Sequence, residues 1–244
     1  MTNLIEPSTA SPVPSLSEPD FSKVRLEESG EPLAELTDSP WLKVIPAYYS
    51  LGFQHALKRT FVRIGVAAKL EAAAKMLPTG MKFLLWDGLR TLPLQSEIAN
   101  RLVHSLKSSC LTVGEIENLC ARFVSPLPAT ISDFQKCPPA HATGGAVDIS
   151  LCDMSGLPLD LGTEFDDFSD RACPDWHERN RYSGGDGPLH LRRLLRQVLI
   201  SVGAVQYHAE WWHFEFGTVR AAACKGAKVA HYGPVVPADG IATQ

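Results

Sequence analysis

The chain has 244 residues, of which 45% are hydrophobic and 20% charged, and its formal net charge is -4 at pH 7. This length suits one domain with a sizeable core, and the slightly acidic balance gives no reason to expect a nucleic-acid partner. No apolar run approaches the ~20 residues that a membrane span needs, and no secretory signal is visible at the N-terminus. We therefore expect a cytoplasmic protein that binds neither nucleic acid nor membrane.

The two ends of the chain differ from its middle in composition. Residues 1–40 are rich in Pro, Ser and Glu and poor in aromatic residues, so they bury too little apolar surface to offset their ordering entropy. We interpret them as a flexible acidic arm, either a plain tail or a partner-binding segment. Residues 236–244 are predicted to form a loose tail, which makes residues 41–235 the predicted domain.

Helical and strand patterns are interleaved through this domain. The expected elements, in chain order, are a helix over Val62–Leu77, a strand over Met81–Trp86, helices over Pro93–Leu106 and Val113–Phe123, a strand over Ala146–Leu151, a helix over Pro188–Val202 and a strand pair over Ala204–Tyr207 and Trp212–Phe216. Because these strands need not be parallel, we predict a single α+β domain. It has a small, mainly antiparallel sheet with helices packed on one face.

The six cysteines form no Cys-x-x-Cys pair. Their spacing therefore supports neither a cysteine zinc site nor a thioredoxin-like motif. Reduced, mostly buried thiols are a simpler prediction than disulfides. Cys152 lies inside an expected strand and is predicted to belong to the core.

Two histidines and one carboxylate stand where polar side chains need a partner. His141 precedes Thr143-Gly144-Gly145, a loop where backbone can pass close to a bound group. Asp148 lies in an otherwise apolar strand and His213 in an aromatic one, so a cation is the simplest partner for both. Such a set suits zinc, and also iron(II), cobalt or nickel. A surface or satisfied core position is the interpretation for the remaining histidines, which are His55, His104, His177, His190, His208 and His231.

Two further motifs carry groups that can act beside such a metal. Glu210 comes three residues before His213 and is placed to take a proton from metal-activated water. In an ideal strand the two would point to opposite faces, so the strand has to begin or bulge there. The alternative is a charged strand edge followed by core aromatics. Arg90 can stabilise an oxyanion while Asp87 holds its guanidinium, or the two form a surface ion pair in a turn.

Together these blocks resemble the VanX-type D-alanyl-D-alanine dipeptidases, within the wider group of zinc D-Ala-D-Ala peptidases. The family pattern Ser-x-His-x-x-Gly-x-Ala-x-Asp is met by His141, Gly144, Ala146 and Asp148, and Glu-x-Trp-His is met by Glu210, Trp212 and His213. Residues 84–90 resemble the strand and turn that bring in the family's transition-state arginine. Residues 161–166 resemble its Met-Gly-Thr/Ser-x-Phe-Asp segment, whose aspartate helps hold the substrate's amino group.

The resemblance implies a function and a role for each of these residues. It implies one zinc ion per chain, bound by His141, Asp148 and His213. The implied catalytic residues are Glu210 and Arg90, and the implied substrate-binding residues are Asp166 and Asp87. The expected partner is a small dipeptide, hydrolysed to free amino acids in a small, enclosed site. D-Ala-D-Ala or a close relative is the implied substrate.

The departures from the family pattern lie where substrate would bind. Pro139 replaces the serine two places before the first histidine, Leu89 replaces a tyrosine, and Thr91 replaces a proline. A repurposed hydrolase of the same mechanism, acting on another small peptide or amide, is therefore an alternative. A second alternative is a non-catalytic, metal-stabilised binding module. The intact Glu210 argues against that module, because binding alone needs no general base.

Overall fold

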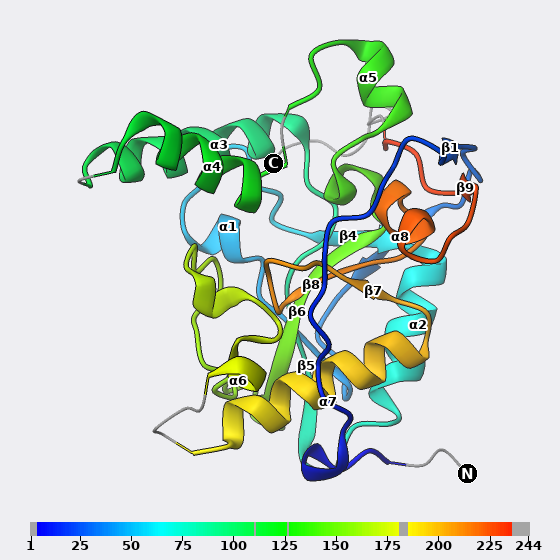
Figure 1. Cartoon of the computed structure of the whole chain (residues 1–244). Helices are drawn as coiled ribbons and strands as arrows, with labels where there is room; N and C mark the ends of the chain where they lie inside the picture. The colour runs from blue at the N-terminus through cyan, green and yellow to red at the C-terminus, as the bar shows by residue number, and fades with distance from the viewer. Residues whose placement is uncertain (1–3, 110, 126, 181–184, 236–244) are drawn as a thin grey trace.

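A five-stranded sheet forms the centre of the protein (Figure 1). The computed structural model describes residues 4–109, 111–125, 127–180 and 185–235. The strands, in sheet order, are β3 (Leu42–Val44), β5 (Met81–Asp87), β6 (Ala146–Asp153), β8 (His213–Glu215) and β7 (Val205–Gln206). The pair β3–β5 is parallel, and every other neighbouring pair is antiparallel. The predicted α+β class with a mainly antiparallel sheet is therefore confirmed.

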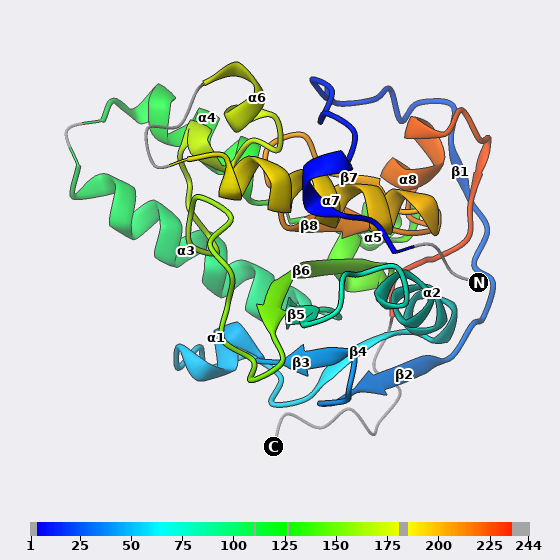
Figure 2. The same cartoon turned by 90° about the horizontal axis from the view of Figure 1, so that it is seen from below.

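Two long helices pack on one face of this sheet. They are α2 (Ile64–Ala74) and α7 (Gly187–Ser201), which lie beside each other in Figures 1 and 2. Their apolar faces share one core with alternate residues of β5 and β6, as the two-residue period of a strand requires. The fully buried members of this core include Leu70, Phe83, Ile149, Leu195 and Val198.

A second group of helices lies beside the sheet and forms its own apolar cluster. Helices α3 (Leu92–Lys107) and α4 (Val113–Phe123) meet α1 (Ala47–Ser50) there. Both longer helices begin where a threonine caps them: Thr91 accepts from the backbone of Leu94, and Thr112 forms a capping box with Glu115. The shorter elements are α5 (Ile131–Lys136), α6 (Trp176–Arg179), α8 (Val219–Cys224), and the 3-10 turns η1 (Pro7–Thr9), η2 (Ala140–Thr143) and η3 (Asp170–Ala172).

The expected helix over Val62–Leu77 is wrong at its start. Residues Thr60–Arg63 form strand β4, and the helix begins only at Ile64 and ends at Ala74. Strand β4 pairs antiparallel with β2 (Leu33–Leu36). This pairing with a distant segment outweighs the local helical spacing, and a Thr-Phe-Val sequence favours a strand.

The N-terminal segment lies along the domain. The backbone N–H of Ile5 donates to the carbonyl of Met76 at 2.9 Å, and Val13 N–H donates to the Glu178 carboxylate at 2.8 Å. Further on, β1 (Arg25–Leu26) pairs in parallel with β9 (Val229–Ala230). The described part of the predicted flexible arm is therefore docked, while the predicted tail, residues 236–244, lies outside the described residues. Within the part of the chain that the structure describes, no helix has the length and apolar character of a membrane span.

Candidate metal centre

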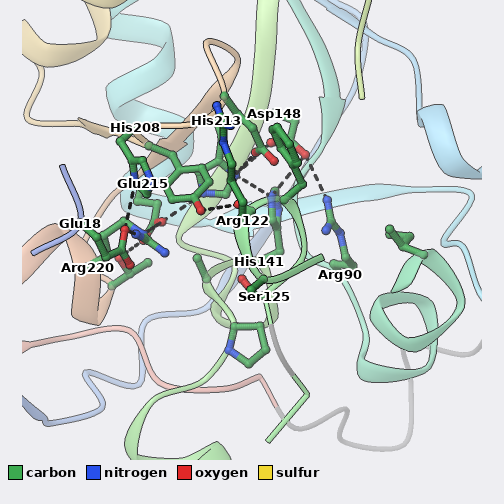
Figure 3. A pocket seen from close by; sticks show the side chains of 18 of the residues that line it. Glu18, Arg90, Arg122, Ser125, His141, Asp148, His208, His213, Glu215 and Arg220 are labelled. Carbon is green, nitrogen blue, oxygen red and sulfur yellow. Dashed lines mark hydrogen bonds and ion pairs between the residues drawn. The ribbon is translucent and has the colours of Figure 1, made fainter. Parts of the chain in front are cut away.

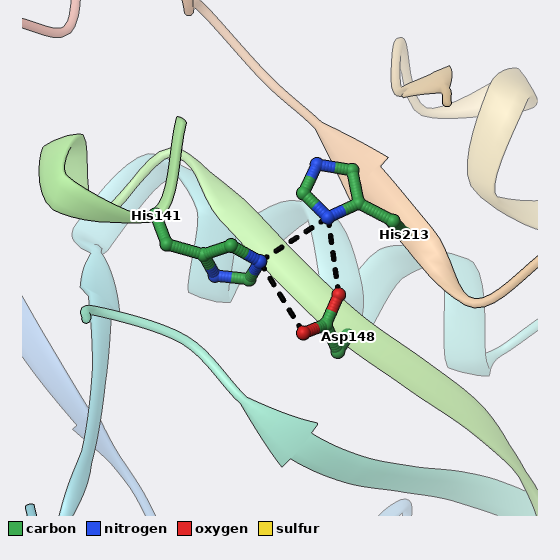
Figure 4. A group of neighbouring side chains, drawn as sticks. All are labelled: His141, Asp148 and His213. Atoms are coloured by element: carbon green, nitrogen blue, oxygen red, sulfur yellow. Dashed lines mark hydrogen bonds and ion pairs between the residues drawn. The ribbon is translucent and has the colours of Figure 1, made fainter. Parts of the chain in front are cut away.

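Three side chains from three elements converge beside the central sheet. His141 comes from η2, Asp148 from β6, and His213 from the first position of β8 (Figure 4). His141 Nε2 lies 3.3 Å from Asp148 Oδ2, and His213 Nδ1 lies 3.1 Å from Asp148 Oδ1. The two ring nitrogens are 3.2 Å apart. All three side chains are buried, and their donor atoms lie within 4.8 Å of one another.

The chemistry of these donors fits a divalent cation. The other nitrogen of each ring faces an acceptor: His141 Nδ1 donates to the Gly88 carbonyl at 2.7 Å, and His213 Nε2 donates to Glu215 Oε1 at 3.1 Å. These partners fix the tautomers, so the nitrogens that face each other carry lone pairs when both rings are neutral. A positive ion between these residues can accept both lone pairs and offset the negative charge of the Asp148 carboxylate. Zinc takes this kind of nitrogen and oxygen set.

The pKa values of Asp148 and His213 depend on their neighbours in this site. Burial alone would raise the pKa of Asp148, but His141 and His213 hold it well below its usual range. Burial also lowers the pKa of His213, yet hydrogen bonds to Asp148 and Glu215 outweigh burial and raise that pKa to about 10. A metal ion bound at His213 Nδ1 competes with a proton for the same lone pair.

Two glycines position His141. Gly144 ends the turn η2 with a φ of 68°, a conformation that glycine adopts without strain. A Cβ on Gly145 would lie only 2.6 Å from the carbonyl oxygen of Phe216. The loop therefore needs small residues so that it can pass close to the end of β8. Close packing against Phe216 therefore explains the need for glycine at position 145, whereas the sequence alone suggested a loop that passes close to a bound group.

A β-bulge at the end of β5 sets the place of Arg90. The register between β5 and β6 shifts between Leu85 and Asp87, so that Asp87 pairs with Asp148. The Asp87 carboxylate accepts from Arg90 Nε at 2.8 Å, and Arg90 Nη2 donates to Asp148 Oδ2 at 3.1 Å. The Arg90 side chain is only 10% exposed, so this is no surface ion pair. Its guanidinium is held against a candidate metal ligand.

Tyr48 links Arg90 to Asp166. Its hydroxyl accepts from Arg90 Nη2 at 3.3 Å and donates to Asp166 Oδ1 at 3.3 Å. Asp166 has a positive φ of 59°, which is uncommon for a residue other than glycine and is often found at functional sites. Burial, followed by the charge of Asp148, raises its pKa to about 7.

Glu210 lies beside the three donors in the loop before β8. Its Oε2 is 3.8 Å from His213 Nδ1, which is too far for a hydrogen bond. Strand β8 begins at His213, so the start of a strand lets both side chains reach one site, as the sequence requires. Burial raises the pKa of Glu210 to about 8 in the absence of a metal ion, and the charges of Asp148 and Asp166 add to this increase.

A second carboxylate behind His213 was not identified from the sequence. Glu215 lies two residues after His213 on the same strand face, and its side chain is 1% exposed. It accepts hydrogen bonds from His213 Nε2, from Thr218 and from Arg220 Nε. These bonds and the Arg220 charge outweigh burial and lower its pKa to about 2. The two-residue spacing of a strand was the signal that could have found it.

A cavity of about 590 Å³ opens beside the metal centre (Figure 3). Arg90, Asp166 and Glu210 line it together with the three candidate ligands. Asp87, expected among the substrate-binding residues, lies behind Arg90 and is not among the described residues that line the cavity.

Two of the departures from the family pattern fall in different places. Pro139, where the family has serine, lines the cavity. Leu89, where the family has tyrosine, is a buried residue and is not among the described residues of the cavity wall. Only the first of these two replacements therefore changes the surface that a substrate would meet.

A family model described as D-Ala-D-Ala dipeptidase matches residues 52–222. The chain belongs to this family. Its members are zinc metallopeptidases. The chain is 29% identical over 217 residues to the D-alanyl-D-alanine dipeptidase of Synechocystis sp., covering 81% of this chain and 86% of that protein. It is 33% identical over 81 residues to the D-alanyl-D-alanine dipeptidase of Escherichia coli, covering 31% and 36% of the two chains.

Two solved structures are also similar. VanYB in complex with D-alanine-D-alanine has a TM-score of 0.41 and 17% identity, over 69% of this chain and 80% of that one. A variant of the vancomycin-resistance D,D-pentapeptidase VanY in complex with zinc has a TM-score of 0.43 and 15% identity, over 84% and 93%. Similarities this weak add nothing to the family assignment, which stands on the sequence.

Proposed function

We propose that this metallopeptidase hydrolyses D-Ala-D-Ala, or a close relative, to free amino acids with one zinc ion per chain. The observation that carries the proposal is the arrangement around one cavity. Three converging metal donors, the buried carboxylate of Glu210 and the cluster of Arg90, Tyr48 and Asp166 all meet there. The two dipeptidase relatives support the substrate class.

His141, Asp148 and His213 would hold the zinc ion. When bound, zinc lowers the pKa of water and polarises a carbonyl group. Glu215 fixes the ring of His213 through its hydrogen bond to Nε2, and the Gly88 carbonyl does the same for His141. Such outer partners orient metal ligands and raise their basicity.

Glu210 is the proposed general base. Its buried carboxylate accepts the proton of the attacking water and then donates that proton to the nitrogen of the leaving amino acid. The C–N bond breaks as the amine leaves, and one carboxylate and one amine are formed. Arg90 stabilises the oxyanion of the tetrahedral intermediate, because Asp87 and Asp148 hold its guanidinium beside the site.

Asp166 is the proposed anchor for the substrate's free amino group. Its carboxylate lies at the end of the cavity next to Tyr48 and Arg90. An ammonium bound there forms a charge-assisted hydrogen bond in a partly dry environment. An anchor for the free amino group suits a peptidase that cleaves after the first residue, as a dipeptidase does.

A repurposed hydrolase remains the second candidate, because two observations favour it. Pro139 removes a hydroxyl from the cavity wall, and the cavity, at about 590 Å³, is in the range that holds ligands much larger than two alanines. That enzyme would use the same residues on another small peptide or amide.

A dipeptide panel separates the two candidates. Zinc-loaded protein is incubated with D-Ala-D-Ala, L-Ala-L-Ala and N-acetyl-D-Ala-D-Ala, each with and without a chelator, and released alanine is measured. We expect fastest release from free D-Ala-D-Ala, loss of activity with chelator and recovery with added zinc. Equal turnover of free and acetylated dipeptides would contradict the dipeptidase and favour the repurposed hydrolase.

A further inference from the structure

The N-terminal segment forms part of the cavity wall. Glu18 and Phe21 both line the cavity, although the rest of the wall comes from residue 48 onward. In Figure 1 this segment is the dark blue trace that passes in front of β7 and β8 on its way to β1. We refer to residues 14–21 as the wall segment.

The wall segment is fixed at both of its ends. On one side, Ser11 N–H donates to Gln197 Oε1 at 2.7 Å and Val13 N–H donates to Glu178. On the other side, Phe21 packs with Val24 against the apolar cluster of Val219 and Ala222. Residues 14–20 lie between these anchors, and the structure describes no backbone hydrogen bond from them to the domain.

Glu18 supplies the polar contacts of the wall segment with the domain. Its carboxylate accepts from His208 Nδ1 at 3.1 Å and from Arg220 Nη1 (Figure 3). Arg220 Nε in turn donates to Glu215, the carboxylate behind the candidate ligand His213. The side chain of Glu18 is 42% exposed. An ion pair with one partner this exposed is worth up to about 1 kcal/mol, so a substitution at Glu18 should loosen the segment by an amount of that order.

This contact lies in the cavity wall on the side of the metal centre away from Arg90 (Figure 3). Arg90 and Tyr48, which contact Asp166, approach Asp148 from one side of the metal centre. Glu18, His208 and Arg220 lie on the other side, behind His213 (Figure 3). A peptide whose ammonium is bound at Asp166 therefore directs its carboxyl end toward the wall segment. A third residue that continues in this direction meets that segment.

We propose that Glu18 is a specificity-determining residue, which holds the wall segment across the carboxyl end of the site and so restricts the substrate to dipeptides. The inference rests on the proposed dipeptidase function. Arg220 and His208 lie at that end, and the Glu18 carboxylate already contacts both side chains. A third residue in the substrate would have to compete with Glu18 for this place.

The test compares two peptides in full-length, zinc-loaded protein. The ratio of kcat/KM for D-Ala-D-Ala-Gly to that for D-Ala-D-Ala is measured for wild type, Glu18→Gln and Glu18→Lys. We expect the ratio to rise at least about fivefold in both variants, which corresponds to about 1 kcal/mol. Glu27→Gln is the matched control, because Glu27 belongs to the same N-terminal segment, pairs with Arg25 on the surface and does not line the cavity. Its ratio should equal that of the wild type.

Hydrogen exchange of residues 14–24 reports on the wall segment without any turnover. Exchange should be faster in Glu18→Lys than in wild type or Glu27→Gln. Unchanged exchange would show that Glu18 does not hold the segment, and faster exchange with an unchanged ratio would show that the segment does not limit substrate length. Either result overturns the proposal. If wild type hydrolyses neither peptide, the dipeptidase function fails and the specificity role falls with it, while exchange still shows whether Glu18 is the contact.

Discussion

Replacing Glu215 with glutamine tests whether the residues behind His213 tune the metal site. The carboxylate accepts from three groups: His213 Nε2 at 3.1 Å, Arg220 Nε at 2.7 Å and the hydroxyl of Thr218. Glutamine keeps the size but has one acceptor oxygen and no charge. His213 Nε2 and Arg220 Nε both donate to Oε1, so the amide oxygen can keep these two hydrogen bonds, but the negative charge is lost and the ring of His213 becomes less basic.

We expect Glu215→Gln to weaken zinc binding by about 10- to 100-fold, the usual effect of losing an outer-shell partner, or about 1.4 to 2.8 kcal/mol. Competition with a chelator of known zinc affinity measures this directly. Glu71→Gln is the matched control, because Glu71 is exposed on α2 and pairs only weakly with Lys75 at 3.2 Å. A zinc affinity of Glu215→Gln equal to that of the control would refute the role of Glu215.

Other perturbations test the remaining parts of the site. Glu210→Gln should keep its zinc but lower kcat at least ~100-fold, because an amide cannot take the proton of water; near-normal turnover would point to another base. Asp166→Asn should lower kcat/KM for free dipeptides far more than for N-acetylated ones, and equal losses would remove Asp166 as the ammonium anchor. Burial raises the pKa of Asp166 from 3.8 to about 7, so ionising it costs stability as pH rises through that range. The Tm of Asp166→Asn should therefore rise relative to the Tm of the wild type as the pH increases from 3.8 to about 7. A Tm difference that stays constant over this pH range would contradict the raised pKa of Asp166. Chelation should lower the Tm and zinc should restore it; a Tm that calorimetry finds unchanged would argue against a metal tied to the folded state.

Several elements around the metal centre could be predicted from local sequence. The apolar runs of β5 and β6 and the amphipathic pattern of α7 indicate buried strands and a helix with one apolar face, and all three lie where expected. The spacing of Glu210 and His213 also required a strand to begin or bulge there, and β8 begins at His213. These features follow from short-range periodicity, which a single sequence contains.

Contacts between distant segments could not be predicted in the same way. Strand β4 replaces the first turn of an expected helix because residues 33–36 pair with it. Tyr48 reaches Arg90 and Asp166, and Glu18 reaches Arg220, across 42 to 202 positions of the chain. No local pattern encodes these partners. Glu215 is different, because its two-residue spacing from His213 places both on one strand face.

The metal content of active protein tests the central claim most directly. Protein that hydrolyses D-Ala-D-Ala is purified without added metal or chelator, and its zinc is measured by elemental analysis against protein concentration. The arrangement of His141, Asp148 and His213 predicts one zinc ion per chain, and none in a variant that replaces Asp148 with alanine. Active protein that contains no divalent transition metal would contradict the account.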